Sequence, residues 1–334
     1  MRSRSKVSAA AVVLVGALAL AGCDATTAPP APTSAPPTAA PSGSASTSPS
    51  PVPSSSGTPT ATPTASSAAA TARAFRTLER DHGARLGVTA IDTGSGQRVT
   101  YRSGERFPFA STNKVFVAAV VLAQSSGADL DTVVHYDRSD LLAHAPVTTR
   151  SVDTGMTVRA LLDAMLRYSD NTAANLLVER VGGPAVVEQA LRDLGDRTTN
   201  VDRVEPDLNE AVPGDARDTT TPAQFAADLR QVLLRSALDP SDRRMLRESM
   251  LGNTTGDATI RAGVDPAWAV ADKTGTGSYG VRNDIGIVFP TGRAPIVVVV
   301  MTSKDTADAE PDDALVAAAT RTAVTAAGSP PSGR

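Results

Sequence analysis

Beyond residue 70 the pattern of apolar and polar positions predicts both helices and strands. Residues 115–123 are nine apolar residues in succession, which is typical of a helix buried on all sides. Residues 158–166 carry apolar side chains at the i, i+3, i+4, i+7, i+8 spacing of an amphipathic helix, and Thr157 is placed to cap it. Short runs of strand-forming residues at 86–91, 98–101, 285–289 and 296–301 predict strands.

Further helices are predicted at residues 72–82, 173–181, 185–194, 222–234 and 312–326. The order is therefore one helix, two strands, many helices, two or more strands and a last helix. We expect the elements from the two ends of the sequence to share one sheet, with the helical middle as an inserted layer.

The first 70 residues follow neither pattern. In residues 1–22, three basic residues precede a short apolar run at 9–20, as in a secretory signal peptide, and this run is too short for a transmembrane helix. The sequence Leu-Ala-Gly-Cys that ends at Cys23 resembles a bacterial lipobox, so we expect Cys23 to be lipidated. The alternatives are an ordinary signal peptide with a chance cysteine, or a buried thiol. Residues 24–70 are Ala, Pro, Ser and Thr with a single charge, which predicts a flexible tether.

These boundaries divide the chain into a lipoprotein signal peptide at 1–22, a lipidated cysteine and linker at 23–70, a globular domain at 71–328 and a flexible tail at 329–334. A lipid on Cys23 would hold the exported domain at the outer face of the cytoplasmic membrane. Partial release from the membrane stays open.

Composition narrows the chemistry. Aromatic residues are only 3% of the 334, so the core must be aliphatic, and a net charge of −3 excludes a strongly basic nucleic-acid-binding protein. One cysteine excludes an intrachain disulfide and a Cys-rich zinc site, and the three histidines lack HxH or HExxH spacing. We therefore expect no metal and no cofactor, and a hydrolase here would use Ser, Lys, Asp or Glu.

Ser111 and Lys114 stand at the start of the buried helix. Three residues apart, they lie on one helix face. A lysine that begins an all-apolar helix is poorly solvated, so it can serve as a proton acceptor or as an electrostatic partner for the serine. The helix N-terminus adds backbone N–H groups near the serine for a developing oxyanion. Alone, this SxxK motif is weak, because a capping serine and a solvent-reaching lysine give the same pattern.

Two further motifs favour a functional role. Ser169-Asp170-Asn171 lies between two predicted helices, where a serine and an amide can point into one cleft and Asp170 can cap the next helix. Residues Lys273–Gly277 (KTGTG) precede the apolar hairpin and are predicted as a strand whose lysine and hydroxyls suit a bound carboxylate. The alternative is a surface strand with a solvated lysine.

The three motifs, in this order, resemble the set found in class A β-lactamases and penicillin-binding proteins. The segment 203–210, with Glu205, Pro206 and Asn209, resembles the omega loop of class A β-lactamases, and residues 213–222 resemble its far end. The resemblance extends over nearly all of residues 71–328. It implies the α/β β-lactamase/transpeptidase-like fold, an antiparallel sheet flanked by helices with an inserted all-helical subdomain.

The resemblance also implies roles for single residues. Ser111 is the nucleophile that opens the β-lactam ring, and Lys114 assists its deprotonation. Ser169 relays a proton to the leaving nitrogen. Glu205 is the general base for the deacylating water, which Asn209 helps to hold. Whether Lys114 or Glu205 is the base of the acylation step stays open.

Other residues are implied to bind substrate or to hold the loop. Backbone N–H groups of Ser111 and Thr276 would form the oxyanion hole. Arg203 and Asp218 would pair to pin the two ends of the omega loop. Two assignments have alternatives without a function. His144 would form a wall of the cleft mouth, or it is an ordinary surface histidine. Arg282 would lie near the carboxylate site, or it is a solvated strand residue. The substrate-binding set is Asn171, Asn209, Lys273, Thr274, Gly275, Thr276, Arg282 and His144.

Three functions share part of this pattern. A serine β-lactamase that acts on penicillins and cephalosporins, expected to be a monomer that confers β-lactam resistance, uses all the motifs. A D,D-peptidase shares the first three motifs but lacks a well-placed deacylating carboxylate, so Glu205 with Asn209 argues against it. A membrane-tethered β-lactam sensor needs a transmembrane or cytoplasmic output, whereas the linker here leads only to a lipid. The substrate spectrum depends on energy differences of ~1–3 kcal/mol, too fine to read from sequence.

Overall fold

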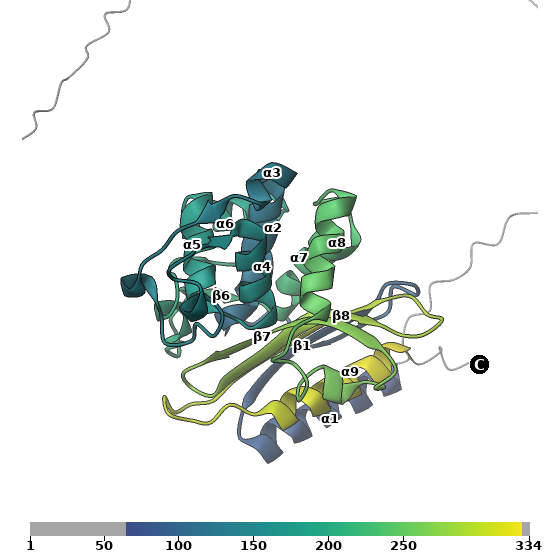
Figure 1. Cartoon of the computed structure of the whole chain (residues 1–334). Coiled ribbons are helices and arrows are strands. Elements are labelled where there is room, and N and C mark those ends of the chain that lie inside the picture. The colour runs from purple at the N-terminus through teal and green to yellow at the C-terminus, as the bar shows by residue number, and fades with distance from the viewer. Residues whose placement is uncertain (1–64, 329–334) are drawn as a thin grey trace, which may run out of the picture. The chain divides into compact units, whose positions relative to one another are not determined.

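A five-stranded antiparallel sheet lies between two helical layers in the computed structural model, which describes residues 65–328 (Figure 1). The strand order is β2-β1-β9-β8-β7. The sheet is built from β1 (Arg85–Asp92), β2 (Arg98–Tyr101), β7 (Ala269–Gly277), β8 (Val281–Phe289) and β9 (Ile296–Ser303). The expected sharing of one sheet by both ends of the domain is confirmed. The expected signal peptide, Cys23 and the tail 329–334 lie outside the described residues.

Both faces of the sheet are covered, which explains why its strands are continuous apolar runs. Along β9, Val297 and Val299 face the helical layer inserted between β2 and β7, while Val298 and Val300 face the layer formed by the terminal helices. This is the two-residue period of a strand, with apolar residues required on both sides. The sheet therefore separates two hydrophobic cores.

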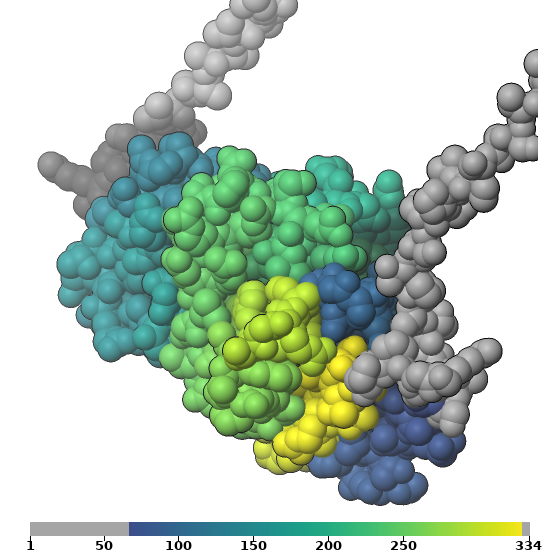
Figure 2. All heavy atoms as spheres, turned by 90° about the vertical axis from the view of Figure 1, so that its right-hand side faces the viewer, coloured from purple at the N-terminus to yellow at the C-terminus, as the bar shows by residue number. Residues whose placement is uncertain are grey.

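The terminal helices α1 (Ala65–His82) and α9 (Asp313–Gly328) lie side by side on one face of the sheet (Figures 1 and 2). Helix α1 begins seven residues before the predicted start at residue 72, so residues 65–70, expected to belong to the tether, are helical. After Pro63 the sequence is mostly alanine, which has the highest helix propensity and no proline to stop it. Similarity of composition to the preceding linker concealed this.

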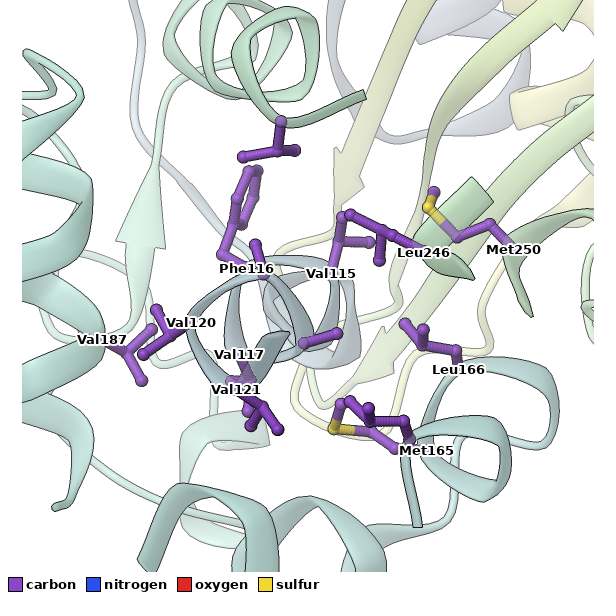
Figure 3. Packing of buried hydrophobic residues seen from close by; sticks show 14 of the residues in the cluster. Val115, Phe116, Val117, Val120, Val121, Met165, Leu166, Val187, Leu246 and Met250 are labelled. Carbon is purple, nitrogen blue, oxygen red and sulfur yellow. The ribbon is translucent and has the colours of Figure 1, made fainter. Parts of the chain in front are cut away.

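The other layer surrounds α2, which has buried residues on every side (Figure 3). Met165 and Leu166 of α4, Leu246 of α8 and Val187 of α6 pack around it. The prediction of a helix buried on all sides is confirmed, and Thr157 caps α4 by accepting a hydrogen bond from the amide of Ala160. The helices of this layer are α2 (Lys114–Gln124), α3 (Gly127–Leu130), α4 (Val158–Arg167), α5 (Asn171–Val181), α6 (Pro184–Asp193), α7 (Pro222–Leu234) and α8 (Pro240–Leu251).

Short elements link these parts. Two small antiparallel ladders pair β3 (Phe107–Pro108) with β6 (Thr219–Thr220), and β4 (Val133–Val134) with β5 (Met156–Thr157). Single 3₁₀ turns are η1 (Ala110–Asn113), η2 (Arg138–Asp140), η3 (Thr148–Arg150), η4 (Asp207–Asn209) and η5 (Arg261–Gly263). Within residues 65–328 none of the helices has the length and apolar character needed to cross a membrane.

Two buried carboxyl groups meet beside α7. Asp228 of α7 and Asp196, which follows α6, are 1% and 0% exposed, and each keeps one carboxyl oxygen without a hydrogen-bond donor among the described residues. The other oxygen of Asp228 accepts from Gln224 at 2.9 Å. Burial, followed by the charge of Asp196, raises the pKa of Asp228 to about 8. Near neutral pH the folded chain thus holds a proton that the unfolded chain has released.

Asp228→Asn is expected to change the pH dependence of stability. Between its ordinary pKa of 3.8 and the folded value of about 8, Asp228 makes the folded state lose stability as pH rises, because only the folded state is protonated there. From pH 6 to pH 7 the wild type should lose about 1.4 kcal/mol more free energy of unfolding than the variant, one proton's worth per pH unit. Urea denaturation at the two pH values measures this. Equal losses in both proteins would show that the pair shares no proton.

Candidate active site

The nucleophile candidate lies where the inserted helical layer meets β7. Ser111 is in η1, directly before α2, and is 8% exposed. The preceding Ala110 has φ +47°, in the left-handed region that costs a non-glycine residue about 1–2 kcal/mol. A side chain at Gly275 of β7 would come within 2.9 Å of the Phe109 carbonyl oxygen and 3.1 Å of the Ser111 amide nitrogen. Glycine at position 275 therefore allows β7 to lie against the backbone of the serine.

Lys114 begins α2 with its ammonium group surrounded by acceptors. Its Nζ is 2.9 Å from Glu205 Oε1, 2.6 Å from Asn171 Oδ1, 2.8 Å from the Ser169 carbonyl oxygen and 3.3 Å from Ser169 Oγ. Burial lowers the pKa of Lys114, and the charge of Glu205 opposes that shift. The ion pair with Glu205 is thus the strongest of the interactions that favour the charged form of this buried lysine.

Ser169 connects the two buried lysines. Its Oγ accepts from Lys273 Nζ at 3.0 Å and from Lys114 Nζ at 3.3 Å. Burial, then the positive charge of Lys114, lowers the pKa of Lys273 to about 7. Ser169 has φ +57°, and the neighbouring Asp170 caps α5 by accepting from the Ala173 amide. The capping role predicted for Asp170 is confirmed, and it fixes the backbone that presents Ser169 and Asn171.

Glu205 is the centre of the hydrogen-bond network. Its Oε1 accepts from Ser111 Oγ at 3.0 Å and pairs with Lys114, and its Oε2 accepts from Asn209 Nδ2. Burial would raise the pKa of Glu205, but the charge of Lys114 and these hydrogen bonds outweigh burial and lower it. Glu205 is therefore an ionised carboxylate in direct contact with the serine hydroxyl.

Asn209 combines two properties that suit it to hold a water molecule. Its Nδ2 is bound to Glu205 and to the Pro206 carbonyl oxygen at 3.1 Å, which fixes the amide plane. Its Oδ1 is buried and has no donor among residues 65–328. An acceptor fixed beside a carboxylate is a place for a water that the carboxylate can deprotonate.

The carboxylate-binding candidates line up on β7 and β8. Thr274 is 3% exposed, and its hydroxyl lies 2.5 Å from that of Thr255. Thr276 pairs with Arg282 across the strands, and the Arg282 guanidinium donates to Thr276 Oγ1 at 3.1 Å and pairs with Asp313 at 2.5 Å. The Arg282 guanidinium is thus shared between two partners. One side of it contacts Thr276 in the candidate site, and the other side is paired with Asp313.

Asn171 and His144 differ in how closely they join the cluster. Asn171 begins α5 and binds Lys114 directly, so it belongs to the network. The His144 ring is bound to the Tyr168 carbonyl oxygen at 3.0 Å and is exposed, and only its backbone contacts Asn171. No group of metal-ligating side chains large enough to hold an ion occurs in the described part of the chain. The site is thus a serine hydroxyl on a carboxylate, two buried lysines and a relay hydroxyl, which suits acyl transfer.

Comparison with known proteins decides the family. The model of the β-lactamase enzyme family matches residues 70–327. The chain belongs to the class A serine β-lactamases. A β-lactamase of Amycolatopsis lactamdurans is 52% identical over 254 residues, covering 76% of this chain and 84% of that protein. β-Lactamase AST-1 of Nocardia asteroides is 49% identical over 256 residues, covering 76% and 83%. The crystal structure of a class A β-lactamase from Clostridium kluyveri superimposes with a TM-score of 0.75 at 45% identity, covering 76% and 97%.

In this β-lactamase the omega loop is closed by an ion pair. Arg203 Nε lies 2.5 Å from Asp218 Oδ2, and Asp218 Oδ1 accepts from the backbone amides of Asp202 and Arg203 at 3.0 Å each. Glu210 takes the other side of the guanidinium. Asp218 is 1% exposed, so these partners take the place of water around its carboxyl group. The pair joins the two ends of the segment that carries Glu205.

Arg203→Ser is expected to loosen the omega loop. The substitution leaves the buried Asp218 with backbone donors only, and an unpaired buried charge destabilises the fold. We expect a lower melting temperature and about ten-fold lower kcat/KM on small penicillins, because Glu205 loses its fixed position. Arg217→Ser is the matched control, since Arg217 is exposed and pairs only with Asp215. A wild-type melting temperature together with wild-type penicillin kinetics in Arg203→Ser would contradict this function of the pair.

The sequence analysis did not single out Asn175 of α5, whose side chain binds the backbone of the omega loop at Glu205. Its side chain donates to the Glu205 carbonyl oxygen at 2.8 Å and accepts from the Glu205 amide at 3.0 Å. A sequence signal existed, because Asn171 and Asn175 are four residues apart and so share one face of α5. Asp313, the partner of Arg282, gave no signal, since it comes from the distant start of α9.

Proposed function

We propose that this enzyme hydrolyses the amide bond of penicillins and cephalosporins through an acyl-enzyme on Ser111. The observation that carries the proposal is the hydrogen bond from Ser111 Oγ to the ionised Glu205, which Lys114 and Asn209 hold in place. A serine whose hydroxyl already donates to a carboxylate base is activated as a nucleophile.

In the acylation step, Ser111 Oγ attacks the β-lactam carbonyl carbon and gives up its proton. The contact at 3.0 Å favours Glu205 as the first acceptor, with Lys114 stabilising the arrangement. The negative charge on the carbonyl oxygen would be stabilised by the backbone amides of Ser111 and Thr276, which the close approach of Gly275 supports.

Ring opening requires a proton on the leaving nitrogen, and Ser169 is suited to supply it. Its hydroxyl lies between Nζ of Lys114 and Nζ of Lys273, so it can pass its proton to the nitrogen and recover one from a protonated lysine. The substrate carboxylate would bind to Lys273, Thr274 and Thr276, with Arg282 beside Thr276 adding positive charge.

The deacylation step needs a water molecule next to the acyl group. Once Ser111 is acylated its hydroxyl no longer donates to Glu205 Oε1, and that lone pair becomes available to a water. The Asn209 Oδ1 acceptor fixes the second hydrogen of this water. Glu205 would then remove a proton from the water while the water oxygen attacks the ester carbonyl carbon. It would return this proton to Ser111 Oγ as the C–O bond of the ester breaks, which releases Ser111 and the ring-opened product.

An assay with a chromogenic cephalosporin distinguishes a β-lactamase from the two alternative functions, a D,D-peptidase and a covalent β-lactam sensor. Sustained turnover at many equivalents of substrate is expected. A single stoichiometric burst would instead favour a D,D-peptidase or a covalent β-lactam sensor, since both are acylated but deacylate slowly. The kinetics of a penicillin, an oxyimino-cephalosporin and a carbapenem would then define the spectrum.

We also propose that the exported enzyme is a monomer anchored by a lipid on Cys23. The proposal is supported by the lipobox-like sequence and by the tether-like composition of the residues that follow. Cys23→Ala is expected to move the protein from the membrane fraction to the soluble fraction without loss of specific activity. Fractionation followed by a β-lactam assay measures both. A variant that stays with the membrane would place the anchor elsewhere.

A further inference from the structure

Asn113 is a buried amide that the mechanism does not use. It lies between the nucleophile and Lys114 in sequence, is 5% exposed, and its Oδ1 has no hydrogen-bond donor among residues 65–328. A buried, unpaired amide oxygen costs about 1–3 kcal/mol, so a residue of this kind requires a partner. The described part of the chain supplies none.

Asn113 borders a small pocket between α2, α5 and the omega loop. Val117, four residues further along the same helical face, and Val178 and Leu208 form its apolar wall, and Lys114 and Glu205 border it as well. Its volume of 20 Å³ exceeds the roughly 10–15 Å³ that one water molecule needs. The pocket thus has room for a water molecule next to Glu205, the general base of the proposed function.

A count of lone pairs shows what such a water would bind. A carboxylate offers about four acceptor sites. Ser111 and Lys114 occupy two at Oε1 of Glu205, and Asn209 occupies one at Oε2, so one site at Oε2 is left. A water in the pocket has two hydrogens to donate, and two residues that line the pocket each offer an acceptor without a donor: this site on Glu205 and Asn113 Oδ1.

We propose that Asn113 is a positioning residue for deacylation, which holds a buried water on Glu205 from the side opposite the substrate. The proposal rests on the proposed function, in which Glu205 activates the hydrolytic water. The buried water donates a hydrogen bond to Oε2 of Glu205. This fixes the carboxylate so that Oε1 faces the acyl group once the acylated Ser111 no longer donates to Oε1. The water acts through Glu205 after Ser111 has been acylated; during acylation the Ser111 hydroxyl itself holds Oε1 of Glu205, so the water is not needed for that step.

Asn113→Leu tests the proposal, because leucine has a similar size and fills the pocket with apolar atoms. The variant replaces a buried polar group and its water by apolar atoms of similar volume, so its melting temperature should equal or exceed that of the wild type. Its deacylation rate should fall about ten-fold, the effect of one hydrogen bond to a charged group, with the acylation rate unchanged. The kcat and KM of a penicillin should therefore fall together. Asn113→Ser, which restores a hydroxyl beside the water, should recover most of the deacylation rate.

Val117→Ala is the matched control, because it alters the same pocket without touching Asn113. It should lower the melting temperature and leave deacylation close to the wild-type rate. A high-resolution crystal structure of the wild type should show an ordered water between Asn113 and Glu205, which Asn113→Leu lacks. Wild-type deacylation in Asn113→Leu, equal slowing in the Leu and Ser variants, or a dry pocket would overturn the inference. Absence of turnover in the wild type would instead overturn the proposed function.

Discussion

Glu205→Ala is expected to react with a penicillin and then to stall as a covalent adduct. Burial lowers the pKa of Lys114, and the charge of Glu205 is the largest effect that opposes this shift. Without the carboxylate the pKa of Lys114 should fall further, which favours the neutral amine that can accept the proton of Ser111. Acylation therefore continues. Deacylation loses its base, and we expect kcat to fall by a factor of about 10² to 10⁴.

Intact-mass spectrometry measures this outcome directly. One β-lactam mass should persist on the Glu205→Ala variant for minutes or longer and should map to the peptide that contains Ser111. Ser111→Ala should give no adduct, and Asp207→Ala should turn over normally, since Asp207 is an exposed acid of the same loop. Near-normal turnover in Glu205→Ala would sink the assignment of the base and place the peptidase-like chemistry first.

Loss of positive charge at Lys273 is expected to weaken substrate capture by roughly 10- to 100-fold, the value of a charge-assisted hydrogen bond to the substrate carboxylate. A lysine is charged below its pKa and neutral above it. Because burial and the charge of Lys114 bring the pKa of Lys273 to about 7, the attraction is present below pH 7 and is lost as pH rises through it. The wild-type kcat/KM, which reports on the free enzyme, should therefore decline above pH 7.

Two variants separate the charge from the side chain. Lys273→Ala should show a low kcat/KM on penicillins that no longer declines above pH 7. Lys273→Arg keeps a charge at every pH tested, so its profile should stay flat there whatever its absolute rate. Steady-state kinetics from pH 5.5 to 9 provide the data. A wild-type decline that persists unchanged in both variants would assign the titration to another group.

The sequence was sufficient to predict a helix or strand where the local pattern of apolar residues reflects how the element is buried in the fold. The nine successive apolar residues of α2 are typical of a helix enclosed on all sides, and the unbroken apolar run of β9 fits a strand whose two faces are both covered. Helix α8 was missed for the opposite reason. Most of its residues are charged or polar, and its burial depends on a few residues such as Leu246 and Met250 that pack on α2 (Figure 3). Tertiary contacts, rather than its own periodicity, stabilise it.

The candidate site was predicted through its motifs but not through its contacts. The spacing of Ser111 and Lys114 placed both on one helix start, yet no spacing indicates that the serine donates to Glu205, 94 positions away. Partners of that kind depend on how the omega loop folds back over α5. Asn113 illustrates the same limit, because nothing in the sequence around this asparagine indicates that it borders a pocket.

The pairing of β1 with β9 has a consequence for the order of folding. Val88 lies opposite Val300, so the centre of the sheet joins segments from the two ends of the domain. A nascent chain cannot complete this ladder until its last strand has left the ribosome, and contacts so distant in sequence form slowly. The domain should therefore complete its sheet only after synthesis has ended. Catalytic capacity would arise only then, when the final strand inserts between β1 and β8.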